Sequence, residues 1–494
     1  MTMRKFEQKF TIHPVGQGLF YSGEIRFNNA VKFRMVFDCG SLPQNKSTNE
    51  VKYYRENNFN TDKILDLLVI SHFDADHINQ IKTLLGSDVK VKRLVMPFLN
   101  FEERLFLAAR FIHNVHDSTE SSEDDQTVNF ILDPLTTLAE NFGDDTEYYF
   151  IENDPDNPIP SDEESTNDDT TSEINEGRFV FGFDTNARIA LTREEKSSLI
   201  PGRPIINTAY KVKDSNKGKL SVPDGRLIVM DFLFYKKNIG LLEDTFYKKV
   251  KEIFYAKCDI GSDDTEEVIM NKILEKIKPM KGSSQVEEIF REAVIMLGIT
   301  SFTITKTELY DLNTTALCMM HRNLKSISQL IGLPRNTDTT YYYPRYANHN
   351  IYIINIMGIT SKRIELSYPS LYHHRYFRDE YSFYRSTFPN ALLTSDSLLK
   401  TETDVNEFLN KYMYYWDYFW LFQIPHHGSE KNADKKLLSR LFYYQSNFIN
   451  YGTDNSHGHP SGDLINDMIS TGISQKLIPI NEFHGVSFEL CLEH

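Results

Sequence analysis

The stretch Ser71-His72-Phe73-Asp74-Ala75-Asp76-His77 decides how the rest of this sequence is interpreted. It follows residues 64–70, a nearly continuous apolar run typical of a strand buried on both faces, and precedes residues 78–85, which show helical spacing. The polar stretch is therefore predicted to be a loop between a strand and a helix. Two His and two Asp within six residues can converge on one point only from such a loop, which indicates a metal site. The alternative is a solvated loop in which Asp74 or Asp76 caps the helix.

Three later segments repeat the order of an apolar strand followed by polar ligands. Residues 392–396 end in Asp396, which is a candidate bridging ligand or, alternatively, the cap of a helix at 398–399. Residues 425–429, Pro-His-His-Gly-Ser, put His426 and His427 before a tight turn with backbone N–H groups suited to an anion; the alternative is an exposed histidine pair. Residues 456–460, Ser-His-Gly-His-Pro, come before a helical pattern at 464–469. The sequence leaves open which histidine of each pair is the ligand, His426 or His427, and His457 or His459.

The composition describes a folded chain whose acidity is local. The 494 residues are 40% hydrophobic and 13% aromatic, which excludes a wholly disordered protein. The net charge is −15, yet residues 116–177 hold 20 Asp and Glu with no Lys or Arg. The remaining residues carry a charge of about +5. The overall charge therefore does not exclude a polyanionic substrate such as nucleic acid.

Membrane and export features are absent from the sequence. The apolar runs are far shorter than the roughly 20 residues that a membrane-spanning helix needs, and no apolar segment follows Arg4 and Lys5 as in a signal peptide. The four cysteines lie far apart, which is typical of reduced thiols rather than disulfides or a thiolate metal site. We therefore expect a cytoplasmic protein that does not bind membranes.

Together these motifs resemble the metallo-β-lactamase superfamily, and more narrowly the branch that contains the soluble domain of bacterial competence-type DNA-uptake proteins and phosphorylcholine esterase. That branch has His-x-Asp-x-Asp-His and Pro-His-His-Gly-Ser, as at 72–77 and 425–429. Its Val-Gly-Gln-Gly, Asp-x-Gly, Leu-Leu-Thr-Gly-Asp and Gly-His-Pro motifs are matched at 15–18, 38–40, 392–396 and 458–460. Residues 313–317 resemble the strand before the Thr-Gly-Asp element. Two departures are Ser395 in place of Gly, and Asn79-Gln80 where relatives often have Gly-Gly.

The resemblance implies an α/β fold, the αββα sandwich of the metallo-β-lactamase superfamily. The match covers about 6–100, 308–325 and 388–490, so we expect a core in two parts, residues 1–100 and 308–494. A large mixed α+β insertion, residues 101–307, would separate them. Within it we expect 116–177 to be acidic and partly disordered and 241–298 to be helical.

The resemblance also implies two divalent metal ions, zinc or manganese, and a role for each matched residue. One ion would be held by His72, Asp74 and His426, and the other by Asp76, His77 and His459, with Asp396 bridging both. Asp38 would orient a ligand histidine from behind, and Ser429 would support the site in the same way. Asp76 and His427 are the candidate catalytic residues; His427 would either support a ligand from behind or donate a proton to the leaving group.

The activity implied is metal-dependent hydrolysis, with a phosphodiesterase or nuclease as the leading prediction. Residues 371–385 alternate Arg with aromatic side chains, which suits phosphate contacts and base stacking, although an ordinary aromatic core edge has the same pattern. Another ester is an alternative substrate. A second alternative is a regulated effector, or a partner-binding component of a multi-protein bacterial system such as a defence system, with the insertion gating the metal site or binding a protein partner. A third is a metal-stabilised binding protein without catalysis.

Overall fold

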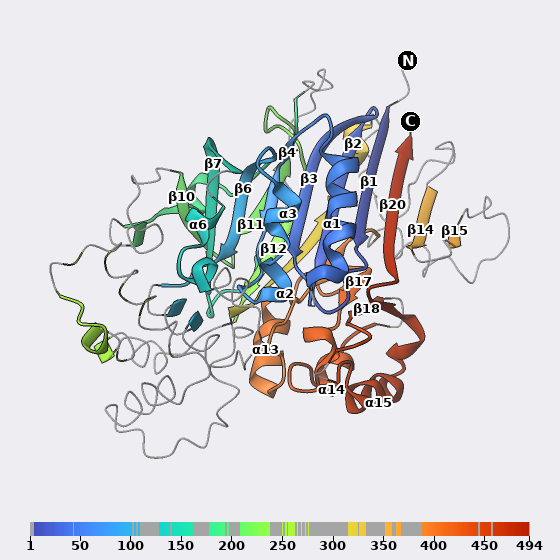
Figure 1. The fold of residues 1–494 in the computed structure, drawn as a ribbon. Coiled ribbons are helices and arrows are strands. Elements are labelled where there is room, and N and C mark those ends of the chain that lie inside the picture. The colour runs from blue at the N-terminus through green and yellow to red at the C-terminus, as the bar shows by residue number, and fades with distance from the viewer. Residues whose placement is uncertain are drawn as a thin grey trace, which may run out of the picture.

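The fold is seen in a computed structural model of the chain (Figure 1). It describes residues 4–42, 44–100, 128–138, 141–161, 177–192, 208–237, 315–324, 326–331, 351–357, 362–366, 388–442, 445–455 and 458–493, with short pieces at 103–104, 107–108, 195–196 and within 249–275. The aromatic and Arg-rich residues 371–385, most of the helical expectation for 241–298, and His457 lie outside the described residues.

The first sheet has twelve strands in the order β15-β14-β20-β1-β2-β3-β5-β6-β7-β10-β9, with β4 paired to β6. The N-terminal strands β1, β2 and β3 are antiparallel, and β3, β5, β6, β7 and β10 run parallel. The strands are β1 (Lys5–Ile12), β2 (Phe20–Phe27), β3 (Ala30–Cys39), β4 (Ile64–Leu65), β5 (Leu67–Val69), β6 (Lys90–Pro97), β7 (Phe142–Glu152), β9 (Ile189–Ala190), β10 (Ala209–Lys213), β14 (Ile351–Met357), β15 (Lys362–Leu366) and β20 (Gly485–Glu493).

The second sheet has eight strands in the order β19-β18-β17-β16-β13-β12-β11-β8. Its C-terminal strands β16 to β19 run parallel, and the strands from β8 to β13 pair antiparallel. The strands are β8 (Val180–Gly182), β11 (Lys217–Ser221), β12 (Ile228–Lys236), β13 (Leu317–Asn323), β16 (Ala391–Leu393), β17 (Leu421–Gln423), β18 (Ser446–Asn450) and β19 (Leu477–Ile480).

The two sheets pack face to face, and helices cover their outer faces (Figure 1). The core between the sheets includes Phe33 of β3 against Phe232 of β12. The layers thus run helix, sheet, sheet, helix, and the expected α/β class is confirmed as a mixed α/β sandwich with few helices. The first sheet is covered by α1 (Gln44–Asn58), α2 (Ala75–Ile78) and α3 (Ile81–Leu85). The second is covered by α13 (Glu402–Lys411), α14 (Lys435–Leu438) and α15 (Gly462–Thr471). The remaining short elements are α6 (Pro134–Thr137), α11 (Ile327–Leu330) and the 3₁₀ turns η2 (Thr185–Ala187), η5 (His426–Gly428) and η6 (Ile473–Lys476).

Strands from residues 101–307 extend both sheets. β7 lies within the acidic segment 116–177, where Tyr148, Tyr149, Phe150 and Ile151 are buried and pair with β6 and β10. β11 and β12 continue the second sheet next to β13. Part of the acidic segment is therefore a core strand, while its residues 116–127 and 162–176 lie outside the described residues. Among the described residues, no helix is long and apolar enough to cross a membrane.

A buried ion pair joins the C-terminal part of the chain to residues from 101–307. Lys411, at the end of α13, lies with its Nζ 2.7 Å from Asp214 Oδ1, and the two side chains are 4% and 0% exposed. Lys411 also donates hydrogen bonds to the carbonyl groups of Asp154 and Asn157. Asp214 accepts backbone hydrogen bonds from Asp154 and Lys236. Both charges are fully compensated, so removing either one leaves a buried charge without its partner.

We expect Lys411→Ala to lower the free energy of unfolding by about 3–5 kcal/mol, because Asp214 then keeps a buried and uncompensated charge. Urea unfolding followed by circular dichroism measures this difference. The matched control is Lys436→Ala, which removes an ion pair with Glu402 whose side chains are 54% and 70% exposed. Its cost should stay below about 1 kcal/mol. Equal costs for the two variants would contradict the structural role given to Lys411.

Candidate metal centre

The site lies where the C-terminal ends of parallel strands from the two sheets meet. Asp38 lies near the end of β3, and His72 follows β5 in the first sheet. Asp396 follows β16, and His426 and His427 follow β17 in the second sheet. Parallel strands end at the same edge of a sheet, so side chains more than 300 residues apart in the sequence come together here.

Two glycines let the segment that carries Asp76 pack against the N-terminal strands. A Cβ on Gly18, which has φ +133°, would lie 2.4 Å from the carbonyl oxygen of Asp76. A Cβ on Gly40 would lie 2.4 Å from the carbonyl carbon of the same residue. Leu19 N–H donates a hydrogen bond of 3.2 Å to that carbonyl oxygen. The two N-terminal glycine motifs of the sequence therefore serve this close approach, which only glycine permits.

Four buried side chains form the centre of the site: Asp76, His77, Asp396 and His427 each have a ligand atom within 4.8 Å of the others. His77 Nε2 lies 3.3 Å from Asp396 Oδ1 and 3.9 Å from Asp76 Oδ1. His427 Nε2 lies 3.1 Å from Asp76 Oδ2 and 3.6 Å from Asp396 Oδ2. Two ligand atoms on a tetrahedral ion, with bonds of about 2.0–2.1 Å, lie about 3.4 Å apart. The spacing therefore suits a metal ion.

Three atoms at the site are buried without a hydrogen bond: His72 Nε2, His77 Nε2 and Asp396 Oδ1. The last two lie within ion-pair distance of each other, but not in hydrogen-bonding geometry. A buried polar atom that lacks a hydrogen bond costs about 1–3 kcal/mol, so three in one place require an explanation. A divalent ion supplies one, since imidazole nitrogens and carboxylate oxygens are its usual ligands. The residues present therefore fit a metal.

The charges of the cluster are strongly coupled. Burial alone would lower the pKa of His77, but the carboxylates of Asp396 and Asp76 raise it well above 6.5. Burial likewise opposes protonation of His427, and Asp396 and Asp76 raise its pKa. Burial would raise the pKa of Asp76, but His77 and His427 lower it to about 2. Without a metal ion, protons on the two histidines balance the two buried carboxylates, and a divalent ion would replace them.

Asp38 lies behind the cluster, and it contacts a histidine as the sequence predicts. Its Oδ2 accepts a hydrogen bond from His77 Nδ1 at 2.9 Å, and its Oδ1 accepts one from the backbone N–H of Ser71 at 2.7 Å. His77 Nδ1 therefore carries a proton, and Nε2 faces Asp76 and Asp396. This is the arrangement of a histidine oriented for a metal by an outer carboxylate.

The structure brings most of the sequence-predicted residues together, with His427 rather than His459 at the centre. His426 Nε2 lies 3.5 Å from Asp396 Oδ2, and the rings of His426 and His459 are 5.4 Å apart; both histidines are partly exposed. Asp74 caps α2 by accepting a hydrogen bond from Ala75 N–H, which is the alternative that the sequence left open. Among the described residues two groups of side chains lie close enough to hold a metal ion, and Asp74 is in neither: Asp76, His77, Asp396 and His427 form one, and Asp38, His72 and His77 form the other.

The structure does not show two other features that the sequence suggested: a helix capped by Asp396, and free backbone N–H groups in the turn at residues 425–429. No helix begins after Asp396; the next described helix begins at Glu402. The backbone N–H groups of His426, Gly428 and Ser429 donate to the carbonyl oxygens of Ser395, Pro425 and His426, respectively. These three groups are therefore used inside the protein rather than offered to an anion. Ser429 is 2% exposed and helps to form this turn.

Two residues at the site have no counterpart in the sequence-based prediction. Asn450, at the end of β18, accepts a hydrogen bond from His427 Nδ1 on its carbonyl oxygen at 2.9 Å, which leaves Nε2 facing the carboxylates. Ser71 Oγ lies 2.9 Å from His72 Nδ1 and 2.5 Å from Asp38 Oδ2. Only their positions could have indicated these residues from the sequence. Ser71 directly precedes the predicted ligand His72, and Asn450 ends β18, which pairs in parallel with the strand before His426 and His427.

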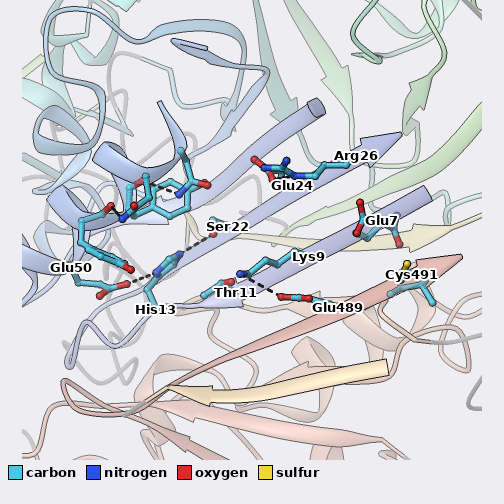
Figure 2. A pocket seen from close by; sticks show the side chains of 16 residues that line it. Glu7, Lys9, Thr11, His13, Ser22, Glu24, Arg26, Glu50, Glu489 and Cys491 are labelled. Atoms are coloured by element: carbon cyan, nitrogen blue, oxygen red, sulfur yellow. Dashed lines mark hydrogen bonds and ion pairs between the residues drawn. The ribbon is translucent and has the colours of Figure 1, made fainter. Parts of the chain in front are cut away.

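A cavity of about 380 Å³ lies apart from this cluster, beside α1 and the strands β1, β2 and β20 (Figure 2). In it, His13 lies 2.8 Å from both Glu50 and Ser22. Burial lowers the pKa of His13, so its neutral ring donates to Glu50 and accepts from Ser22. These contacts join α1 to the sheet, and none of the predicted metal ligands lines the cavity.

Comparison with models of known protein families gives no match to this chain, and comparison with curated proteins gives none either. The assignment of the site therefore depends on its residues and geometry.

The metal-free protein should lose stability as the pH rises from about 6.5 to about 8.5. His77 and His427 have raised pKa values in the folded state, so the folded protein binds more protons than the unfolded chain above pH 6.5. Their contribution is complete below about 6.5 and is lost as the pH rises through the folded pKa, at up to about 1.4 kcal/mol per histidine and pH unit. Urea unfolding of chelator-treated protein across this range measures the slope.

Added Zn²⁺ should stabilise the protein most at the upper end of that range, because it replaces protons that are no longer bound. His77→Gln should reduce both the pH slope and the stabilisation by Zn²⁺. A stability that is constant or rises from pH 6.5 to 8.5 in the metal-free protein would contradict the charge balance described above.

Proposed function

We propose that this chain is a metal-dependent hydrolase of the metallo-β-lactamase type, and that its substrates are phosphodiesters, nucleic acid among them. The observation that carries the proposal is the buried cluster of Asp76, His77, Asp396 and His427 at the meeting edges of the two sheets. The layer order of helix, sheet, sheet, helix and the motif resemblance support it. A cytoplasmic location remains a prediction from the sequence.

Asp76, His77, Asp396 and His427 would hold one divalent ion. Asp396 contacts His77 through Oδ1, and it contacts both His427 and His426 through Oδ2, so it lies between the central cluster and His426. It is therefore the residue that would bridge to a second ion, with His426 and His72 as further donors. The mixture of nitrogen and oxygen donors suits zinc and also manganese.

Bound divalent ions would activate water and neutralise charge on a phosphoryl group. The protein residues hold this chemistry in place. Asp38 and the Asn450 carbonyl fix the Nδ1 protons of His77 and His427, so that both Nε2 atoms point inward. Asp76 and Asp396 are at most 5% exposed, so bulk water does not screen them, whereas the His426 side chain is 21% exposed. The substrate would therefore approach from the side of His426 and His459.

Asp396→Asn should reduce phosphodiester hydrolysis by more than about 100-fold, because it removes the charge and one donor from the residue placed to bridge two ions. The assay uses chelator-treated protein reloaded with Zn²⁺ or Mn²⁺, on bis(p-nitrophenyl) phosphate, single- and double-stranded DNA, and RNA. The matched control is Asp434→Asn, the same chemical change at the cap of α14, where Asn is an equally good capping residue.

The Asp434→Asn control should keep wild-type activity. Chelator-treated wild-type protein that is not reloaded with metal should have none. Full activity of the Asp396 variant, or hydrolysis that survives complete removal of metal, would overturn the proposed function. Activity on other esters but on no phosphodiester would retain the metal site and reject the substrate class.

A further inference from the structure

Ser395 occupies a conformation that favours glycine. Its φ is +49°, in the left-handed region, where a residue with a Cβ is strained. A strained residue next to a buried polar cluster indicates that its side chain does something there. The branch that the sequence resembles has Gly at this position, so the hydroxyl group is a feature of this chain.

The backbone of Ser395 is held by the second sheet. Its N–H donates to Gln423 Oε1 at 2.8 Å, and its carbonyl oxygen accepts from His426 N–H at 3.0 Å. Gln423 ends β17, so these two bonds join the loop that carries Asp396 to the loop that carries the histidine pair. These two backbone hydrogen bonds fix the position of Ser395 independently of its side chain.

The side chain of Ser395 reaches across to the first sheet. Its Oγ lies 2.7 Å from Ser71 Oγ, 3.2 Å from Asp38 Oδ2 and 3.4 Å from His77 Nδ1. All four residues are buried. The hydroxyl therefore connects the loop of Asp396, from one sheet, to the residues that orient the histidines of the other.

The number of available protons decides which group donates in each of these hydrogen bonds. Asp38 is the acceptor for Ser71 Oγ–H at 2.5 Å and for His77 Nδ1–H at 2.9 Å. Because the only proton of Ser71 Oγ goes to Asp38, that oxygen must accept from its other neighbours. The Ser395 hydroxyl therefore shares its one proton between Ser71 Oγ at 2.7 Å and Asp38 Oδ2 at 3.2 Å, and His72 Nδ1–H donates to Ser71 Oγ at 2.9 Å.

This order of donors leaves His72 with a bare Nε2. The Nδ1 proton of His72 is used in the bond to Ser71 Oγ, and a second proton on Nε2 would have no acceptor. Its Nε2 is one of the buried atoms without a hydrogen bond. The chain of hydroxyl groups thus presents the electron pair of this nitrogen to the site.

We propose that Ser395 is a positioning residue for the metal centre: its hydroxyl fastens the Asp396 loop to Asp38 and Ser71, and so sets Asp396 against His72 and His77. The inference rests on the proposed metal site and assigns a role to a residue that is not a ligand. The strained backbone is retained because the left-handed conformation aims the hydroxyl at the other sheet.

The test compares Ser395→Gly and Ser395→Ala with Ser397→Ala. Ser397 is a matched control, because it is buried two residues away and contacts Cys318 and the Ala316 carbonyl instead of the site. Two quantities are measured: Zn²⁺ affinity, by competition with a chromophoric chelator, and urea unfolding of the metal-free protein. Both positions lose a buried hydroxyl, so a general packing effect would appear in all three variants.

We expect both Ser395 variants to bind Zn²⁺ about 10–100-fold more weakly, the range typical of outer-shell partners, and Ser397→Ala to bind within about twofold of wild type. Ser395→Gly should nevertheless unfold at a urea concentration no lower than that of the wild type, because glycine relieves the strain. Loss of affinity without loss of stability separates positioning from a merely structural role.

Wild-type affinity in both Ser395 variants would overturn this inference and leave the proposed function standing. Affinity that falls only in proportion to stability, in Ser397→Ala as well, would also overturn it. If the wild-type chain binds neither Zn²⁺ nor Mn²⁺, the proposed function itself fails, so the two failures are distinguishable.

Discussion

The compensation of two buried carboxylates, Asp76 and Asp396, is the constraint on which the rest of this site depends. Both lie out of reach of bulk water, one from each sheet, and each faces His77 and His427 at 3.1–3.9 Å. Two such charges cannot stay close together in a protein interior without positive charge between them. Protons on the two histidines meet this need in the absence of metal. A divalent ion would meet it too, and it would also satisfy the nitrogen and oxygen atoms that make no hydrogen bond.

The fold places these charges by ending parallel strands of both sheets at one edge. The end of β3 supplies Asp38, and the loop after β5 supplies His72 and leads into α2. The loops after β16 and β17 supply Asp396 and the histidine pair. Several of these loop residues have positive φ, among them Asp38, Ser395, His426 and His427. Such strain is found where side chains must point inward at a strand end, and here it is offset by buried hydrogen bonds.

The sequence predicted the parts of this arrangement that depend on local pattern. The buried strand before His72 and the strand ends at Asp396 and His426 follow from apolar runs with polar ends, and the α/β class was implied by the motif resemblance. The sequence pattern did not predict that His427 lies at the centre of the cluster. This placement depends on the backbone of His426 and His427, which are both left-handed and turn the two side chains in different directions. The ligand role of Asp74 stays a prediction. In the structure its side chain caps α2, and a sequence does not distinguish a capping Asp from a ligating one.

The acidic segment shows the limit of composition as a guide to structure. Counted together, residues 116–177 are strongly acidic, but β7 within them has exposed Asp144 and Asp145 at its start and four buried aromatic or aliphatic residues after Glu147. A charge count cannot tell a solvated strand end from a separate tail. The role of Ser395 was also hidden, because its importance comes from contacts with residues more than 300 positions away.

The most direct test of the central claim is the metal content of the purified protein, measured by inductively coupled plasma mass spectrometry after dialysis with Zn²⁺ or Mn²⁺. The account predicts at least one tightly held ion per chain in the wild type, and loss of that ion in a folded Asp76→Ala/His77→Ala double variant. A wild-type protein that retains no divalent ion, or a double variant that retains as much as the wild type, would contradict it.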